Sequence, residues 1–499
     1  MKFIIEVHPT HITVSDADEC INILEPLLDK YQYEDEYIES INILGFYIDE
    51  KTNTLYLNKG VSVDYLVHML KTQCEVKLSS GGNPCKPMNF EYEEIVPPRD
   101  DVQTEIIDFI AGTGIWNDII DVNQIFVVAA TGLGKTYCSC VGSCMYNTKT
   151  LVICGSIDIL KQWRNSYIEK TGMCDADIHS LDTSDLMTAI DNELDLGEVY
   201  LLSHATFLHA FGRMGESFEL MNKAISNLGI GLKIIDEAHL NFANTLKIDF
   251  AMNVRRNLYL TATDGRSNRD EDAIFKSVFS KATYFKKSEN HTRKWVEYNA
   301  IFLNTHCPPA RYRYQVAGGR GMSPVKYGKF VIDKDKKKKM HYKCIIEIIR
   351  DCFKNDNHSK ILVFLPLIDE CNELKYMMNM TLGRDKYFEY DLNITTINSH
   401  NSKKENDRAR AGDVIITTIQ SCGTGTDIPG TTDIICCSPF KSTITTKQVL
   451  GRLRYCGKVC HYYDIIDESV PMDIIFAKLR LKTFRKYCLS TNSMQWEEE

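Results

Sequence analysis

The chain has 499 residues, of which 44% are apolar and 25% are charged, and its net charge is −9. These values are ordinary for a globular protein of about three domains. No apolar run approaches the roughly 18 residues of a membrane span. The N-terminal MKFIIEVHPT places Glu6 and His8 where a signal peptide needs an apolar core, and the 18 cysteines form no C-x-x-C pair. We therefore expect a cytoplasmic protein with free thiols and no membrane partner.

Residues 1–90 are expected to form a small α+β domain. FIIEV and HITVS are typical of short strands, and apolar residues at helical spacing predict a helix over 18–31. INILGFYID and TLYLN flank DEKTN, which indicates a hairpin, and a helix (VDYLVHML) and a strand (CEVKL) follow. SSGGNPCKP is typical of a linker. Residues 1–95 hold 17 acidic and 7 basic residues, and this net charge of −10 disfavours a broad DNA-binding surface.

From residue 96 the pattern changes to alternating strands and helices. The strands are nearly continuous apolar runs, as in a parallel sheet buried on both faces, and are expected at 125–130, 150–155, 199–203, 232–237 and 257–263. We predict a first domain over 96–300 and an interdomain connection, with a hairpin, over 301–330. The lysine-rich run at 333–339 fits either a solvated helix start or a nucleic-acid contact.

A second α/β domain is expected over 331–499. A helix is predicted at KMHYKCIIEIIRDCF, and strands are predicted at ILVFLP, ITTINS, VIITT, DIICCS and HYYDII. The predicted fold class is therefore α/β, with two tandem doubly wound parallel-sheet domains behind a small α+β domain.

The first strand of the first domain runs into a phosphate-binding loop. The sequence Ala130-Thr131-Gly132-Leu133-Gly134-Lys135-Thr136 ends at the start of a predicted helix. In the pattern G-x-x-x-x-G-K-[ST], backbone N–H groups surround phosphates at a helix N-terminus, although Ala129 replaces the first glycine here. We expect Thr131, Gly132 and Gly134 to lie against the nucleotide, Lys135 to reach the β- and γ-phosphates, and Thr136 to bind Mg²⁺.

A pair of carboxylates follows the strand LKII about a hundred residues later. Asp236 and Glu237 begin the sequence Asp-Glu-Ala-His, which ends at His239. Carboxylates at the carboxyl end of a parallel strand suit a nucleotide site. We expect Asp236 to hold Mg²⁺ through water and Glu237 to activate the attacking water.

Together the two motifs resemble those of the superfamily 2 helicases, over roughly residues 96–470. The resemblance implies RecA-like domains and the cofactors ATP and Mg²⁺. In PPRDDVQ, it implies that Gln103 contacts adenine and that Arg99 supports it. VICGSIDILKQW is similar to the next motif, with Gln162-Trp163 retained, and Thr261-Ala262-Thr263 to the element that couples ATP to nucleic acid. In ITTIQSCGTGTDIP, it implies that Gly425 and Asp427 approach ATP and that Thr418 faces the nucleic-acid backbone.

The last motif, KQVLGRLRY, is similar to Q-x-x-G-R-x-x-R with one residue missing between the arginines. If the segment is helical, Arg452 and Arg454 lie about 200° apart, whereas Gln448 and Arg452 share a face. We expect Arg452 to be the arginine finger beside Gln448 and Arg454 to be the lesser candidate. Gly457 indicates that the helix ends soon after Arg454.

The motifs and the small N-terminal domain resemble the phage UvsW-type helicases. That resemblance implies an ATP-dependent DNA helicase that acts on single-stranded and branched DNA in recombination, repair or replication. An RNA or RNA–DNA hybrid helicase, and a duplex translocase that separates no strands, are alternatives. The N-terminal domain is equally compatible with DNA binding through Lys71, Lys77 and Lys86, with protein recognition, and with support of the motor.

Overall fold

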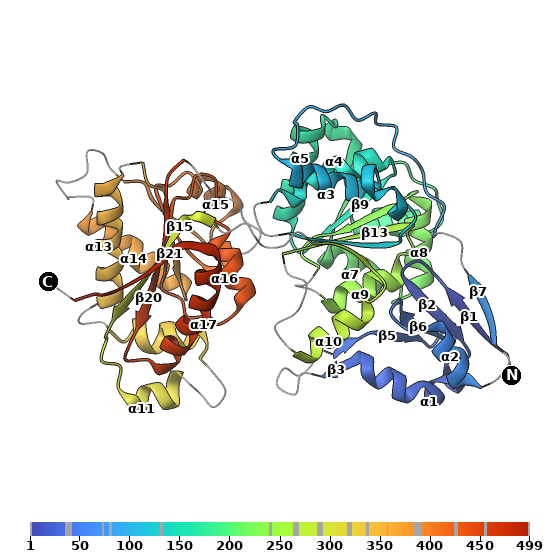
Figure 1. The fold of residues 1–499 in the computed structure, drawn as a ribbon, viewed down its shortest axis with the longest axis horizontal. Helices are drawn as coiled ribbons and strands as arrows, with labels where there is room; N and C mark the ends of the chain where they lie inside the picture. The colour runs from blue at the N-terminus through green and yellow to red at the C-terminus, as the bar shows by residue number, and fades with distance from the viewer. Residues whose placement is uncertain are drawn as a thin grey trace. The chain divides into compact units, whose positions relative to one another are not determined.

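The computed structural model of the chain describes residues 2–34, 42–71, 74–78, 82–129, 133–238, 242–262, 269–286, 293–316, 322–335, 339–356, 358–382, 392–423, 428–453 and 457–497. The chain divides into two compact units, Met1–Ser288 and Glu289–Glu499 (Figure 1). Among the described residues, no helix is both long and apolar enough to span a bilayer.

The N-terminal region of unit 1 is built on a five-stranded sheet in the order β5-β6-β2-β1-β7. Strands β5 and β6 form the predicted antiparallel hairpin, whereas β7 is parallel to β1. INIL is not part of that hairpin, because Asn42–Leu44 pairs with Gln32–Glu34 instead. The elements are β1 (Phe3–Val7), β2 (His11–Ser15), α1 (Ala17–Leu28), η1 (Asp29–Tyr31), β3 (Gln32–Glu34), β4 (Asn42–Leu44), β5 (Phe46–Asp49), β6 (Thr54–Asn58), α2 (Val63–Leu70) and β7 (Cys74–Leu78).

The segment expected to be a linker lies along unit 1 and is bonded to it. The backbone N–H of Asn83 donates to Asn253 O at 2.8 Å, and that of Lys86 donates to Gly229 O at 2.9 Å. The N-terminal region and the first α/β domain are therefore one compact unit.

The first α/β domain is built on a seven-stranded, all-parallel sheet in the order β10-β11-β9-β12-β13-β8-β14. Its elements are α3 (Asp101–Ala111), η2 (Gly114–Ile119), β8 (Gln124–Val128), α4 (Lys135–Tyr146), β9 (Thr150–Cys154), α5 (Ile157–Thr171), η3 (Asp175–Asp177), β10 (Ile178–Ser180), α6 (Thr183–Ala189), β11 (Val199–Ser203), α7 (His204–Arg213), α8 (Phe218–Asn227), β12 (Leu232–Ile235), α9 (Phe242–Ala251), β13 (Arg256–Thr261), α10 (Arg269–Val278) and β14 (Thr283–Lys286).

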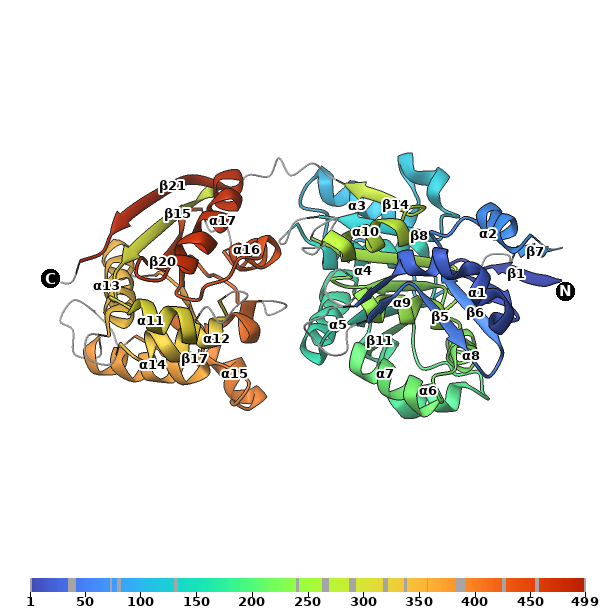
Figure 2. The same cartoon turned by 90° about the horizontal axis from the view of Figure 1, so that it is seen from below.

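Alternate residues of each strand enter different cores. Ile125 and Val127 of β8 pack with α3, α4 and α5, whereas Phe126 between them packs with α8, α9 and the N-terminal strands. The ribbon shows α3, α4 and α5 on one face of the sheet and α7 and α9 on the other (Figures 1 and 2). Burial on both faces explains the continuous apolar runs in the sequence.

Unit 2 contains a second seven-stranded, all-parallel sheet, in the order β17-β18-β16-β19-β20-β15-β21. Its elements are β15 (Arg293–Leu303), α11 (Pro309–Arg311), η4 (Tyr312–Val316), α12 (Pro324–Tyr327), η5 (Gly328–Ile332), α13 (Met340–Asn355), β16 (Ile361–Leu365), α14 (Ile368–Thr381), β17 (Ile394–Ile397), α15 (Lys403–Ala409), β18 (Val414–Thr418), η6 (Ile419–Gly423), β19 (Asp433–Cys436), α16 (Thr443–Leu450), β20 (Cys460–Asp467), α17 (Pro471–Tyr487) and β21 (Cys488–Gln495). The predicted fold class, two doubly wound parallel sheets with a small N-terminal α+β domain, is confirmed.

The predicted division near residue 300 differs from the structure. Strand β15 pairs with β20 in the second sheet, so it belongs to unit 2. The expected connection over 301–330 is also part of that unit, since Cys307, Val316 and Tyr327 lie in its core. Its described residues form short helical turns and not a hairpin. Residues 336–338 of the lysine run lie outside the described residues.

Candidate nucleotide site

The loop expected to bind phosphate connects β8 to α4. Residues 130–132, and with them Thr131 and Gly132, lie outside the described residues. On either side of them, Ala129 is bonded through its N–H to Thr261 O at 3.1 Å, and Lys135 is the first residue of α4. Lys135 Nζ donates to Ala129 O at 2.9 Å, which brings the ammonium group back across the loop. Thr136 is the second residue of α4, in the turn whose N–H groups attract anions.

Gly134 caps α4 with φ of +84°, a conformation that favours glycine. A Cβ atom at this position would lie 2.4 Å from Gln103 Nε2. Gln103 Nε2 donates to Leu133 O at 3.1 Å, and Gln103 Oε1 accepts from the N–H of Arg99 at 2.8 Å. The amide group retains one donor hydrogen and one acceptor position, enough for a bidentate contact with a base. The Arg99 guanidinium itself is paired with Asp100 at 3.1 Å.

Asp236 and Glu237 form the turn after β12. The turn is fixed by two neighbouring strands, because Asp236 N–H donates to Ile153 O of β9 and Ala238 N–H donates to Leu260 O of β13, each at 3.0 Å. Glu237 has φ of +49°, which few residues other than glycine adopt. Such a backbone at the end of a parallel strand is common where side chains are held for function.

Burial raises the pKa of Asp236 to about 6, and the charge of Glu237 acts in the same direction. The Trp163 hydrogen bond and the charge of Lys135 oppose that rise. Repulsion between two adjacent carboxylates is relieved by a cation. A Thr hydroxyl at a helix start and a carboxylate are hard oxygen ligands that fit Mg²⁺.

In unit 2, Thr418 is the last residue of β18 and Gln448 lies on α16. The Thr418 hydroxyl is engaged by its own turn, donating to Ser421 Oγ at 2.9 Å and accepting from Ser421 N–H at 3.2 Å. Gly425 and Asp427 lie outside the described residues. Gln448 on α16 and Arg452 beyond its end are both buried, with 6% and 8% of their surfaces exposed.

The last motif is not the continuous helix that the sequence suggested. Helix α16 ends at Leu450, so the 200° separation calculated for Arg452 and Arg454 does not apply. Gly451 keeps right-handed helical angles, and Arg452 N–H donates to Val449 O at 3.0 Å. Arg452 therefore occupies one tight turn after the helix. Arg454 and His239 lie outside the described residues.

Two sequence families match the chain. Residues 101–266 match the family described as type III restriction enzyme, res subunit. Residues 340–456 match the helicase conserved C-terminal domain. The first match contains the phosphate-binding loop and the Asp236–Glu237 turn, and the second contains the QVLGR motif. The chain belongs to the superfamily 2 helicases.

Solved structures confirm that the fold of this helicase is RecA-like. S. cerevisiae Dbp5 bound to RNA and ADP-BeF3 has a TM-score of 0.52 and 12% identity over 87% of this chain and 94% of that chain. The DEAD-box helicase Mss116 bound to ssRNA and UDP-BeF has a TM-score of 0.53 and 14% identity over 82% and 76%. T4 UvsW matches over 99% of this chain and 100% of that chain, with 13% identity and a TM-score of 0.36. No curated protein matches the helicase in sequence.

One contact of the candidate site was not expected from the sequence. The indole N–H of Trp163 donates to Asp236 Oδ2 at 3.0 Å, across 73 residues of sequence. The resemblance of the motif VICGSIDILKQW implies no role for the Trp163 side chain. No spacing in the sequence indicates the contact, because it depends on how α5 packs against β9 and β11.

Proposed function

We propose that this helicase hydrolyses ATP to translocate on DNA and to unwind or branch-migrate forks and junctions. We propose DNA as the substrate because residues 101–266 match a restriction-enzyme subunit family, and restriction enzymes act on DNA. The choice of branched DNA rests on the motifs and the N-terminal α+β domain, which resemble those of the UvsW-type helicases. The functional context is recombination, repair or replication.

In this proposal the ATP contacts of unit 1 have separate roles. Gln103, kept in place by Arg99, reads the adenine base. Thr131, Gly132 and Gly134 surround the phosphates, and Lys135 neutralises the β- and γ-phosphate oxygens. Thr136 and Asp236 hold Mg²⁺, which supplies charge neutralisation at those oxygens. Glu237 accepts the proton of the attacking water.

The unit 2 residues respond to the state of the nucleotide. Arg452 stabilises the charge that develops on the γ-phosphate, together with Gln448, which precedes it by four residues. Gly425 and Asp427 contribute further ATP contacts. Arg454 has a lesser role. Since the arginine belongs to a different unit from Lys135, its interaction with ATP couples hydrolysis to movement along DNA.

An ATPase assay with several nucleic acids tests the substrate. The ATPase rate of the wild-type chain is measured with single-stranded DNA, a fork, a four-way junction, blunt duplex or RNA as the activator. Strand displacement is measured in parallel. We expect forks and junctions to stimulate most. Stimulation by RNA alone would contradict the proposal, and stimulation by blunt duplex without displacement would identify a translocase.

Two variants test the ATP machinery in the same assay. Lys135→Ala is expected to abolish turnover while DNA binding persists. Glu237→Gln is expected to lower kcat by about 10²- to 10⁴-fold while ATP still binds, because only proton transfer is removed. Normal turnover in either variant contradicts the role given to that residue.

An RNA or RNA–DNA hybrid helicase is the second candidate. It is favoured by the fold shared with Dbp5 and Mss116, both of which were solved with RNA bound. At 12% and 14% identity this likeness extends only to the fold, so RNA is the alternative outcome of the same assay.

A further inference from the structure

Trp163 of α5 is buried against the carboxylate of Asp236. Only 1% of its surface is exposed, and its Nε1–H donates to Asp236 Oδ2 at 3.0 Å. The backbone N–H of Asp236 is separately fixed to Ile153 O of β9 at 3.0 Å. Thus β9 restrains the main chain of Asp236, and α5 restrains one of its two carboxylate oxygens.

The indole group is fixed by its own surroundings. Helix α5 is capped at its start by Ser156, whose hydroxyl accepts from Ile159 N–H at 3.3 Å. The Trp163 ring packs beside Tyr167, with 6.3 Å between ring centroids. The Tyr167 hydroxyl is in turn bonded to Ser143 Oγ of α4 at 2.8 Å. The donor is therefore positioned by two packed helices and needs little reorganisation when a ligand binds.

We propose that Trp163 is a positioning residue for the magnesium-holding carboxylate. By donating to Oδ2, the indole N–H limits rotation of the carboxylate and so fixes the orientation in which Asp236 would hold Mg²⁺. The effect acts through Asp236, in the way that outer hydrogen bonds orient metal ligands. This inference rests on the role proposed for Asp236 and extends it by naming the residue that orients it.

A packing role alone does not account for the arrangement. An aromatic ring without an N–H group would fill the same core, whereas a buried indole N–H normally requires a partner. Trp116 of the same unit provides the contrast. Its ring packs on Phe109 at 5.1 Å, and its buried Nε1 has no hydrogen-bond partner within the described part of the chain. Trp116→Phe is therefore a matched control for Trp163→Phe.

The test measures how Mg²⁺ supports nucleotide binding and turnover in the full chain. A fluorescent ADP analogue is titrated with and without Mg²⁺, and the Mg²⁺ dependence of ATPase activity is measured. In Trp163→Phe we expect metal-free ADP affinity to be unchanged and the half-saturating Mg²⁺ concentration to rise about tenfold, in line with the loss of one hydrogen bond to a charged group. Trp116→Phe should match the wild type in both measurements.

Asp236→Asn separates this inference from the proposed function. If Asp236→Asn leaves the Mg²⁺ dependence unchanged, the role of Asp236 is wrong and the inference fails with it. If Asp236→Asn is impaired but Trp163→Phe equals the wild type, the inference alone fails. A lowered thermal midpoint of Trp163→Phe with normal Mg²⁺ dependence also overturns it, because that result describes packing only.

If Trp163→Phe does not fold, an NMR measurement on protein that retains Trp163 tests the inference instead. The chain has 4 tryptophans, so indole ¹⁵N–¹H signals are assigned by substituting Trp116, Trp295 and Trp496. Addition of Mg²⁺ to the ADP-bound protein should shift the Trp163 signal and leave that of Trp116 in place. An unmoved Trp163 signal overturns the inference.

Discussion

Gly134 is constrained both by its backbone and by its neighbour. Its φ of +84° costs a residue with a side chain about 1 kcal/mol, and a Cβ would lie 2.4 Å from Gln103 Nε2. Gly134→Ala should therefore displace the side chain that we expect to read adenine. We predict that the KM for ATP rises about tenfold, measured by steady-state ATPase activity, since 1.4 kcal/mol corresponds to a factor of ten.

Gly212→Ala is the matched control for that substitution. Gly212 lies inside α7, and a Cβ there meets no atom within 4 Å. Alanine in a helix should stabilise the protein by up to about 1 kcal/mol and leave the KM unchanged. Equal KM values for the wild type and Gly134→Ala would show that Gln103 does not depend on this glycine.

His204 is a buried titratable group at the start of α7. Burial lowers its pKa to about 4, and its Nδ1 has no partner among the described residues. The unfolded chain takes up a proton near pH 6.5, whereas the folded chain does not until about pH 4. The stability contributed by neutral His204 is thus complete above pH 6.5 and is lost as the pH falls, by roughly 2 kcal/mol at pH 5.

Comparison with His204→Leu isolates this effect. The raised pKa of Asp236 has the opposite influence on stability, so the pH dependence of the wild type alone does not identify the histidine. We predict that His204→Leu gains roughly 2 kcal/mol relative to the wild type between pH 7.5 and pH 5, measured by urea unfolding. His209→Asn, at an exposed position of the same helix, should show no such gain.

At the scale of elements, strands with continuous apolar runs were predictable from the sequence, whereas β15 was not. β8, β9, β11, β16 and β18 were found from their apolar runs. β15 was not, because Glu297 and Asn299 interrupt its sequence. In the folded chain Asn299 Oδ1 accepts from Asn492 Nδ2 of β21 at 3.1 Å, so this polar group is satisfied by a strand almost 200 residues away. Sequence alone does not supply that partner.

In the candidate site, too, some features were predictable from the sequence and others were not. The position of Asp236 and Glu237 directly after a strand was predictable, because the apolar run and the two carboxylates are consecutive in the sequence. The end of α16 was not, since Gly451 can continue or end a helix depending on what packs around it. The Trp163 contact with Asp236 is a tertiary pairing and has no local signal.

A buried ion pair ties α9 to the strand that carries Asp236. Lys233 Nζ of β12 lies 2.7 Å from Asp249 Oδ1 of α9, with 0% and 3% of the side chains exposed. The Tyr259 hydroxyl of β13 donates to Asp249 Oδ2 at 2.8 Å. Lys233→Met leaves a buried carboxylate without its counter-charge, and we predict a loss of about 3 kcal/mol in unfolding free energy.

The double variant Lys233→Met/Asp249→Asn is the informative control. Asparagine removes the charge but still accepts a hydrogen bond from Tyr259. We expect the double variant to recover about half of the lost stability, measured by urea unfolding of the full chain. A double variant as unstable as Lys233→Met would show that lost packing, not the uncompensated charge, dominates.

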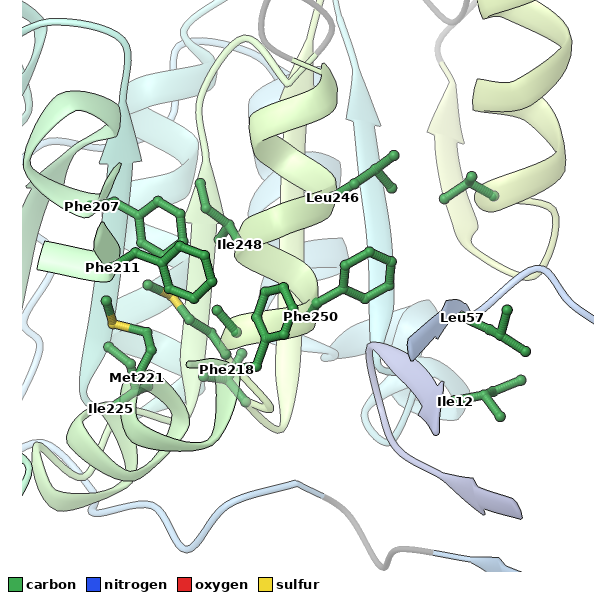
Figure 3. Packing of buried hydrophobic residues seen from close by; sticks show 14 of the residues in the cluster. Ile12, Leu57, Phe207, Phe211, Phe218, Met221, Ile225, Leu246, Ile248 and Phe250 are labelled. Atoms are coloured by element: carbon green, nitrogen blue, oxygen red, sulfur yellow. The ribbon is translucent and has the colours of Figure 1, made fainter. Parts of the chain in front are cut away.

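At the scale of the whole molecule, the N-terminal region is part of the motor's hydrophobic core. Figure 3 shows Ile12 and Leu57 of the N-terminal strands in one cluster with Phe218 of α8 and Phe250 of α9. Polar contacts reinforce the packing, since Lys281 Nζ donates to Val61 O at 3.0 Å and Lys51 Nζ donates to Gly215 O at 3.1 Å. Of the three roles considered for this region, support of the motor fold is the one that these contacts favour.

Truncation to residues 82–499 should therefore expose an apolar surface, including Phe218 and Phe250, and leave a poorly folded motor. We predict strong binding of a hydrophobic dye and loss of ATPase activity. Gly60→Val tests the same contact in the full chain, because a Cβ at Gly60 would lie 1.9 Å from Ser277 O of α10. It should lower the thermal midpoint of unit 1 by several degrees, since about 1 kcal/mol shifts a domain of this size by 2–4 °C. A truncated chain with wild-type midpoint and activity would instead identify the region as a separable binding domain.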